Sequence, residues 1–425
     1  MIPVGPTSAR ILILADWPDP IEAARQSPLS SYAADEFNKL LHEAGLTRGE
    51  CLVACLSSRT APQVKGKEDL SAWVSHTKNA KGECREKLHS SWVCPELDTD
   101  VRRFAELVRL VQPTVIIALG SLALYALTGV TSVKKWRGSQ LHYKLAADSQ
   151  ITVIPTYAPR YLQRDFSVRA ITALDLKRAA RVSREGGVSR PVFDFLVRPS
   201  FAGARASLAA LHARVQAGPI RISIDIETRA GHMACIGFAT DKRAAFCIPL
   251  MCAERAEGYW SHLEETMLVM EMREIMTHPN ALCFGQNFLY DVQYIYRFWM
   301  CLPNIWYDTM IAQHVMFPGQ PKGLDYLASM YCEHYVYWKD DGKTWDEKTG
   351  EDQLWTYNCE DCVRTYECME AQWPALDALG VRGVWDFQQN TLFPLLLKAM
   401  NRGVRCDVAD KARLSMMPVS YTHLT

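Results

Sequence analysis

A short run in the second half of the sequence carries two acids with a spacing that could support metal chemistry. Asp225 and Glu227 lie in 221–227, where isoleucines alternate with polar residues. Because a strand has period two, both carboxylates project from the same face. Adjacent like charges repel unless a cation lies between them. The run is therefore a candidate metal site, and the alternative is a solvated edge strand with incidental acids.

Two further pairs have the spacing of one helix face. Asn287 and Asp291 are four residues apart where a short strand is predicted to run into a helix. They could also be an ordinary helix cap and a first-turn acid. Tyr357 and Asp361 have the same spacing within 355–373, whose apolar residues recur every three or four positions and predict a buried helix.

The first third of the chain alternates apolar runs with helical patterns. Unbroken apolar strands separated by helices indicate a parallel sheet covered on both faces, hence an α/β fold. We expect strands at 11–14, 51–54, 115–119 and 151–154 and helices at 32–44 and 101–111.

A second domain follows a stretch at 182–191 in which Gly, Ser, Arg and Pro replace any periodicity. Its alternating strand at 221–227 and a predicted hairpin over 231–250 indicate a mixed sheet. We expect its helices at 201–216, 261–277, 288–299, 323–331 and 351–373.

Composition excludes several classes of protein. With 48% hydrophobic and 22% charged residues, the 425-residue chain is neither disordered nor fibrous. Lys+Arg and Asp+Glu are both 47, so no overall basic field exists and any contact with nucleic acid must be local.

Compartment and membrane contact can also be judged from the sequence. Fourteen cysteines are too dilute for a disulfide scaffold, and the first residues lack the pattern of a signal peptide. We expect a cytoplasmic protein, in the host cytoplasm if it is viral. The uncharged run 114–130 is broken by Gly120 and Ser121, so it predicts a strand and a helix, not a membrane span.

The acidic motifs together resemble a known family. Asp-Ile-Glu-Thr from Asp225, Asn-x-x-x-Asp from Asn287 and Tyr-x-x-x-Asp from Tyr357 closely resemble the DEDDy 3'-5' exonuclease domain of family A DNA polymerases, in the DnaQ-like group. Residues 307–310 and 323–328 are similar to its connecting region. The resemblance covers about 195–375 and implies a ribonuclease H-like mixed-sheet fold.

The resemblance implies a two-metal hydrolysis of phosphodiester bonds at single-stranded DNA 3' ends, with magnesium or manganese. Asp225 would bridge both ions, and Asp291 would support the second through water. The implied metal ligands are Asp225, Glu227, Asp291 and Asp361.

The remaining implied site residues act on water and substrate. The Tyr357 hydroxyl would orient the attacking water, since a phenol with a pKa near 10 is a poor base at neutral pH. Thr228 and Asn287 would contact the terminal nucleotide. Expected partners are a DNA 3' end and other replication proteins. The alternatives are an RNase D-like RNA exonuclease and a non-catalytic DNA-binding module.

Residues 5–180 resemble the uracil-DNA glycosylase superfamily, especially its iron-sulfur branch, through 5–19, 113–120 and 155–160. Where that family has a G-E-x-P-G loop, this chain has Ala-Asp-Trp-Pro-Asp at 15–19. Where it has His-Pro-Ser, this chain has Ala-Pro-Arg at 158–160, so the imidazole that stabilises the departing base is missing. We expect a degenerate domain without base excision.

Two residue sets in this domain stay open. Four cysteines could form an iron-sulfur site, but their irregular spacing favours ordinary core or surface thiols; they are Cys51, Cys55, Cys84 and Cys94. Five cations could either contact phosphates of DNA or form a solvated surface; they are Lys134, Lys135, Arg137, Arg160 and Arg164.

The resemblances divide the chain into segments. After the exonuclease-like part, 388–407 resembles the link to the polymerase thumb, and no palm or fingers motifs follow. We expect a glycosylase-like domain at 1–181, a linker at 182–194, an exonuclease domain at 195–378, a truncated start of the thumb at 379–416 and a non-native tail at 417–425.

Overall fold

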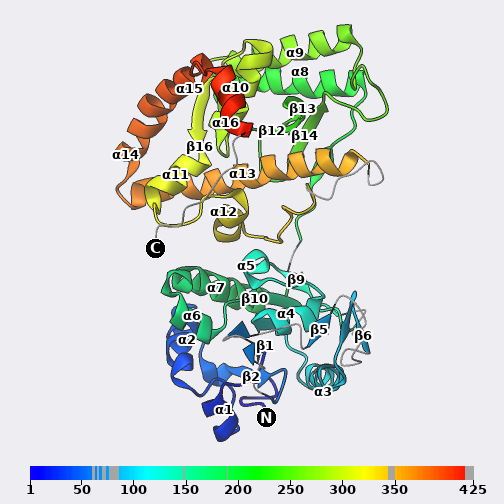
Figure 1. Cartoon of the computed structure of the whole chain (residues 1–425), viewed down its shortest axis with the longest axis vertical. Coiled ribbons are helices and arrows are strands. Elements are labelled where there is room, and N and C mark those ends of the chain that lie inside the picture. Colours follow the sequence, from blue (N-terminus) through cyan, green and yellow to red (C-terminus); the bar gives the residue numbers. More distant parts are fainter. Residues whose placement is uncertain are drawn as a thin grey trace. The chain divides into compact units, whose positions relative to one another are not determined.

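The computed structural model describes residues 1–59, 63–64, 67–68, 73–75, 86–146, 149–188, 190–342 and 350–416 (Figure 1). The proposed tail at 417–425 lies outside these ranges. The chain divides into two compact units, the first made of Met1–Val192 with Asp325–Lys343 and the second of Phe193–Leu324 with Thr344–Thr425. The chain therefore leaves the first unit, returns to it over a short segment, and leaves again.

The first unit is built on a five-stranded sheet in the order β2-β1-β8-β10-β9, in which all neighbours are parallel except β9. Alternate residues of β1 face two separate cores, with Leu12 and Leu14 in one and Ile11 and Ile13 in the other. The sheet is thus covered on both faces, as the unbroken apolar strands predict. The strands are β1 (Ile11–Ala15), β2 (Cys51–Cys55), β8 (Val115–Leu119), β9 (Leu141–His142) and β10 (Thr152–Thr156).

Helices cover this sheet, and α7 continues to Glu185, past the start of the expected linker. The longer helices are α2 (Tyr32–Glu43), α3 (Pro95–Val111), α4 (Ser121–Thr128) and α7 (Arg169–Glu185). Shorter elements are α1 (Pro20–Arg25), η1 (Arg48–Glu50), β3 (Gln63–Val64), β4 (Lys67–Glu68), β5 (Val74–Ser75), β6 (Glu86–Leu88), β7 (Ser91–Val93), α5 (Val133–Trp136), α6 (Pro159–Arg164) and η3 (Phe166–Val168). None of the helices in the described ranges has the length and hydropathy needed to span a bilayer.

The second unit is built on a mixed six-stranded sheet in the order β11-β14-β13-β12-β15-β16. Its β12 lies between antiparallel β13 and parallel β15, so the alternative of a solvated edge strand for Asp225 and Glu227 is wrong. The strands are β11 (Asp194–Leu196), β12 (Ile220–Arg229), β13 (His232–Ala239), β14 (Ala244–Pro249), β15 (Ala281–Gly285) and β16 (Ile305–Asp308). The predicted α/β class, with one parallel and one mixed sheet, is confirmed.

The two faces of this sheet are covered by different helices. Isoleucines of β12 pack in one core with α8 and α9, while Trp355 and Cys359 of α13 pack in a second core with Cys235 of β13. The helices are α8 (Phe201–Ala217), α9 (His262–Thr277), α10 (Phe288–Trp299), α11 (Thr309–Met316), α12 (Leu324–Tyr331), α13 (Asp352–Ala378), α14 (Arg382–Phe387), the π-helix η4 (Gln388–Leu392), α15 (Phe393–Arg402) and α16 (Val408–Met416).

The long helix α13 continues beyond its predicted end at Trp373 and contains Pro374. The ring of Trp373 packs at 5.5 Å from that of Trp385, and the Arg382 guanidinium lies 3.7 Å from the same ring. These tertiary contacts hold the last turns, which a local rule for proline cannot anticipate.

Candidate metal centre

Strand β12 places two carboxylates on the face of the sheet that α13 covers. Ile222, Ile224 and Ile226 are buried in the opposite core. Period two then forces Asp225 and Glu227 toward α13. In the antiparallel register Asp225 lies opposite Gly237 of β13, and the pairing shifts just after Glu227.

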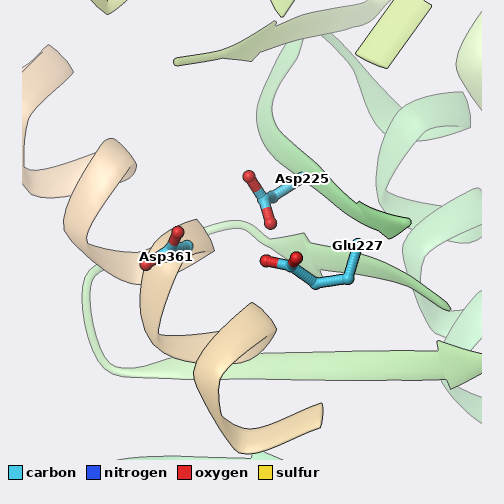
Figure 2. A group of neighbouring side chains, drawn as sticks. All are labelled: Asp225, Glu227 and Asp361. Atoms are coloured by element: carbon cyan, nitrogen blue, oxygen red, sulfur yellow. The ribbon is translucent and has the colours of Figure 1, made fainter. Parts of the chain in front are cut away.

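The third carboxylate comes from α13. Carboxylate oxygens of Asp225, Glu227 and Asp361 all lie within 4.8 Å of one another (Figure 2). Asp361 is buried, and the other two are half-buried. Hard divalent cations such as magnesium prefer several carboxylate oxygens converging in this way. This donor set therefore fits a divalent metal ion.

Asp291 lies in the first turn of α10 and reaches the same strand by another contact. Its Oδ1 accepts a hydrogen bond from the backbone N–H of Ile226, at 2.9 Å, between the two acids of β12. Burial is the main cause that raises the pKa of Asp291 well above its usual value, and the charges of Asp308 and Glu227 add to it, while the Ile226 N–H acts in the opposite direction. Asp291 thus binds the β12 backbone between Asp225 and Glu227, while the described carboxylates whose oxygens converge are those of Asp225, Glu227 and Asp361.

Tyr357 lies one turn before Asp361 on α13. Burial, followed by the charges of Asp361, Glu227 and Asp225, raises the pKa of the Tyr357 phenol above its usual value of 10, and a hydrogen bond with Asp361 acts in the same direction. The hydroxyl therefore keeps its proton at neutral pH. It can donate a hydrogen bond beside the carboxylates but cannot act as a base.

The two residues expected to contact substrate have different surroundings. The Thr228 hydroxyl shares a hydrogen bond of 3.0 Å with the hydroxyl of Tyr290, a half-exposed residue on α10 that the sequence reasoning missed. Asn287 is exposed, has a left-handed backbone with φ of 54°, and is the cap residue of α10. Tyr290 could have been noticed because it directly precedes Asp291.

The structure adds Asn358, which is fully buried on α13 between Tyr357 and Asp361. Its Nδ2 donates to the backbone carbonyl of Asp225 at 3.0 Å and to Asp225 Oδ2 at 2.8 Å. Both partners are acceptors, so the amide orientation is fixed. A Cβ atom at Gly237 would lie 2.3 Å from Asn358 Oδ1, so a glycine is required there. Its position between two predicted site residues was the available sequence signal.

Asp308 is a second missed residue, and it positions α10. Its carboxylate accepts from the backbone N–H groups of Asn287 at 3.1 Å, Phe288 at 2.8 Å and Met310 at 2.8 Å. These donors lie at the starts of α10 and α11, so Asp308 fixes the turn that carries Asp291. Burial raises the pKa of Asp308 to about 6, against the effect of the backbone donors.

The first unit has a cavity of about 310 Å³ beside β1, β8 and β10, lined by Asp16, Trp17, Lys134 and Arg160 among others. The Asp16 carboxylate accepts from the Ala123 N–H at 2.7 Å and so caps α4. The Arg160 guanidinium lies 4.7 Å from the centre of the Trp17 ring. The cavity thus presents Ala158 where the glycosylase pattern has histidine and Arg160 where it has serine.

One of the expected cations is differently placed. Arg137 is buried and forms an ion pair with Asp175 at 2.7 Å, so neither a phosphate contact nor a solvated face describes it. Lys135 pairs with Asp340 on the surface at 3.0 Å.

The three described cysteines of the proposed cluster set are buried in core clusters, Cys51 and Cys55 in one and Cys94 in the other. Burial raises the pKa of Cys51 to about 11 and of Cys55 to about 12, so these thiols stay protonated. Cys84 lies outside the described residues.

Comparisons with known protein families give one match in each half of the chain. Residues 2–178 match the uracil DNA glycosylase superfamily, and residues 203–377 match a 3'-5' exonuclease family. No sequence among the curated proteins matches this chain.

Solved structures with similarity to this chain include three nucleases. The catalytic core of RRP6 from Trypanosoma brucei is 15% identical, with a TM-score of 0.36 over 48% of this chain and 53% of that one. Escherichia coli RNase D is 16% identical, with a TM-score of 0.34 over 50% of this chain and 51% of that one. Brucella melitensis NrnC with bound Mg²⁺ is 10% identical, with a TM-score of 0.33 over 55% of this chain and 100% of that one.

This chain spans about half the length of the RRP6 and RNase D structures. The two family matches follow one another along the sequence without overlap, and the acidic cluster lies within the second. The chain therefore carries a region similar to the uracil DNA glycosylase superfamily, followed by a region similar to a 3'-5' exonuclease family.

Proposed function

We propose that this protein is a metal-dependent exonuclease that removes nucleotides from the 3' end of single-stranded DNA, as in the proofreading of family A DNA polymerases. The observation that carries the proposal is the convergence of Asp225, Glu227 and Asp361, with oxygens within 4.8 Å of one another. The match of the preceding domain to a superfamily that acts on DNA supports DNA as the substrate.

The proposed cofactor is a pair of magnesium or manganese ions. Asp225, Glu227 and Asp361 would hold the first, and Asp225 with Asp291 would hold the second. Such ions, when bound, supply the positive charge that stabilises the attacking and leaving oxygens of a displaced phosphodiester. They also attract an anionic strand to a chain whose formal net charge is zero.

The chain's own groups position the reactants. The protonated Tyr357 hydroxyl donates toward the attacking water and orients it. Asn358 holds the Asp225 carboxylate in one orientation by donating to Oδ2. Thr228 and Tyr290, joined through their hydroxyls, hold the terminal nucleotide next to Glu227.

A row of aromatic rings extends from Tyr290 and offers a path for the strand. Along α10 the ring centroids of Tyr290 and Tyr294 are 4.9 Å apart, and those of Tyr294 and Phe298 are 6.1 Å apart. His232 continues the row, 5.3 Å from Phe298. Exposed aromatic rings let bases of a single strand stack without regard to sequence. This row supports a single-stranded substrate.

The test compares 5'-labelled DNA and RNA strands of one sequence, with and without magnesium or manganese. We expect stepwise shortening of the DNA that requires metal and is abolished by Asp225→Ala without unfolding. Faster shortening of RNA would support the RNase D-like alternative. Binding without any metal-dependent shortening would support the non-catalytic module. A uracil-containing duplex should release no uracil, and an abasic product would contradict the degenerate assignment of the first domain.

A further inference from the structure

The first unit contains a short segment whose neighbours on both sides along the sequence belong to the second unit. This docked segment, residues 325–342, starts in α12 and continues as an irregular chain. It lies within the range that matches the exonuclease family. Its contacts with the rest of the first unit include several polar ones that are buried.

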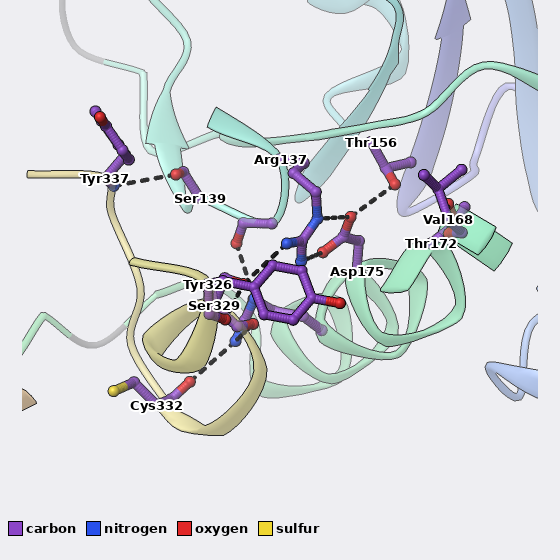
Figure 3. A network of polar contacts seen from close by, with 12 residues as sticks. Arg137, Ser139, Thr156, Val168, Thr172, Asp175, Tyr326, Ser329, Cys332 and Tyr337 are labelled. Carbon is purple, nitrogen blue, oxygen red and sulfur yellow. Dashed lines mark hydrogen bonds and ion pairs between the residues drawn. The ribbon is translucent and has the colours of Figure 1, made fainter. Parts of the chain in front are cut away.

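Arg137 is the centre of these contacts (Figure 3). Its Nε and Nη2 donate to the two oxygens of Asp175, at 3.0 and 2.7 Å, and its Nη1 donates to Ser329 Oγ of the docked segment at 2.9 Å. Thr156 Oγ1 also donates to Asp175, at 2.8 Å. Arg137 is 4% exposed and Asp175 is 0% exposed. The N–H donors of the Arg137 guanidinium are therefore bound to partners within the protein.

Arg178 recognises the backbone at the end of α12. Its Nη2 donates to the carbonyls of Ser329 at 2.9 Å and Cys332 at 3.0 Å, and its Nη1 donates to the carbonyl of Gly138 at 3.1 Å. The last carbonyls of a helix have no partner within it and attract a cation. Arg178 is 8% exposed and therefore satisfies these carbonyls away from water.

The loop after Arg137 binds the backbone of the docked segment through one backbone and two side-chain hydrogen bonds. The Gln140 N–H donates to the Tyr335 carbonyl at 2.8 Å, and the Tyr335 N–H donates to Gln140 Oε1 at 2.9 Å. The Tyr337 N–H donates to Ser139 Oγ at 3.1 Å. Gly138 is required in this loop, because a Cβ there would lie 2.5 Å from Asp175 Oδ1.

We propose that residues 137–140 and Arg178 form a docking site whose occupant is the chain's own segment 325–342. The glycosylase-superfamily fold uses these buried cations to hold a part of the exonuclease sequence and not a phosphate. Release of the segment would exchange each of these bonds for a bond to water, and the net loss is largest for those donated by the charged guanidinium groups. The first unit is consequently completed by residues that follow it by more than a hundred positions.

The test cuts the chain between the units and asks whether the docked segment keeps the pieces together. A protease recognition sequence is inserted in the full chain between Val192, which is exposed, and Phe193. After cleavage, the wild-type pieces should elute together in size-exclusion chromatography. Arg178→Ala should weaken their association about 10- to 100-fold, as expected for loss of hydrogen bonds to a charged donor.

Gln140→Ala is the second variant, since it removes the Oε1 acceptor of the Tyr335 N–H but keeps the backbone bond to the Tyr335 carbonyl and the buried Arg137–Asp175 pair. It should weaken association about two- to tenfold while circular dichroism stays unchanged. Arg169→Ala is the matched control, because that arginine pairs with Glu36 and Glu43 within the first unit. It should leave the pieces associated as in the wild type.

Hydrogen exchange of the uncut chain gives an independent readout, in which Gln140→Ala should increase exchange at the Tyr335 amide. Separation of the wild-type pieces on cleavage would overturn the proposal. Equal association of the Arg178→Ala and Gln140→Ala pieces and the control would also overturn it. If Arg178→Ala fails to fold, the Gln140→Ala result decides. None of these readouts depends on nuclease activity.

Discussion

Replacing Asn358 with alanine removes the two hydrogen bonds that hold Asp225, at 2.8 Å to Oδ2 and 3.0 Å to its backbone carbonyl. A hydrogen bond to a charged acceptor contributes about 1.5–3 kcal/mol. If that energy maintains the orientation of Asp225 needed for metal binding, its loss corresponds to about a 10- to 150-fold fall in kcat/KM. The metal concentration for half-maximal rate should rise in parallel.

Stability should change much less than activity. The Asn358 Oδ1 atom is buried and finds no hydrogen-bond partner among the residues that the structure describes, which costs about 1–3 kcal/mol in the folded state. Asn358→Ala removes this cost together with the two favourable bonds, so the free energies partly offset. An asparagine retained for packing alone would give the opposite result, with a loss of stability and little effect on the metal requirement.

The assay measures shortening of a 5'-labelled single strand over a magnesium titration, together with the denaturation midpoint. Asn304→Ala is the matched control, since its Nδ2 also donates to two carbonyls, of Pro279 and Ala281, at 3.0 Å each. The reasoning is refuted if kcat/KM and the half-saturating metal concentration of Asn358→Ala both stay within about twofold of the wild type.

Further predictions concern the neighbouring groups. Tyr357→Phe should lower kcat about 10- to 100-fold while binding of the strand is unchanged, measured as kcat and KM separately. Asp361→Asn should abolish activity, raise the melting temperature of the metal-free protein by relieving repulsion, and abolish the stabilisation by manganese seen in the wild type. Asp308→Asn tests the pKa of about 6, above the usual 3.8. The folded wild type then binds more protons than the unfolded chain between about pH 4 and 6, so its stability relative to the variant should fall as pH rises through that window, by up to about 3 kcal/mol, and stay level above it. A difference in denaturation midpoint between the wild type and Asp308→Asn that does not change with pH would contradict this last prediction.

Much of the fold could be predicted because its signals are local. The strands of the first unit are short apolar runs that are buried on both faces, and such runs have few other stable environments. Asp225 and Glu227 follow from period two in β12, and Tyr357 and Asp361 follow from helical spacing in α13. In each case the relevant geometry is set within five residues.

The rest depends on partners distant in the sequence. Arg137 looks like any surface cation until Asp175 and Ser329, the latter 192 residues away, are placed beside it. Asn358 shows its role only when β12 is paired with β13 so that Gly237 leaves room for the amide. Neither composition nor periodicity contains these pairings, because they arise from the register and from chain segments that return to an earlier unit.

Buried carboxylates occur at two places, Asp175 in the first unit and Asp291 with Asp308 in the second, and they differ in whether a positive charge of the protein lies beside them. This difference separates a structural role from a functional one. Asp175 has a guanidinium on both oxygens, so the protein itself supplies a full positive charge. Asp291 and Asp308 are held by backbone N–H groups, and the pKa of each is raised because these neutral donors do not offset burial. A protein that only needed to anchor α10 would be at least as stable with an uncharged residue at these positions. Asp291 and Asp308 are thus buried carboxylates without a neighbouring positive charge in the described part of the chain, and they lie beside three more carboxylates that converge. A divalent ion would neutralise such a group, so the centre is better explained as a metal site than as an ion-pair network.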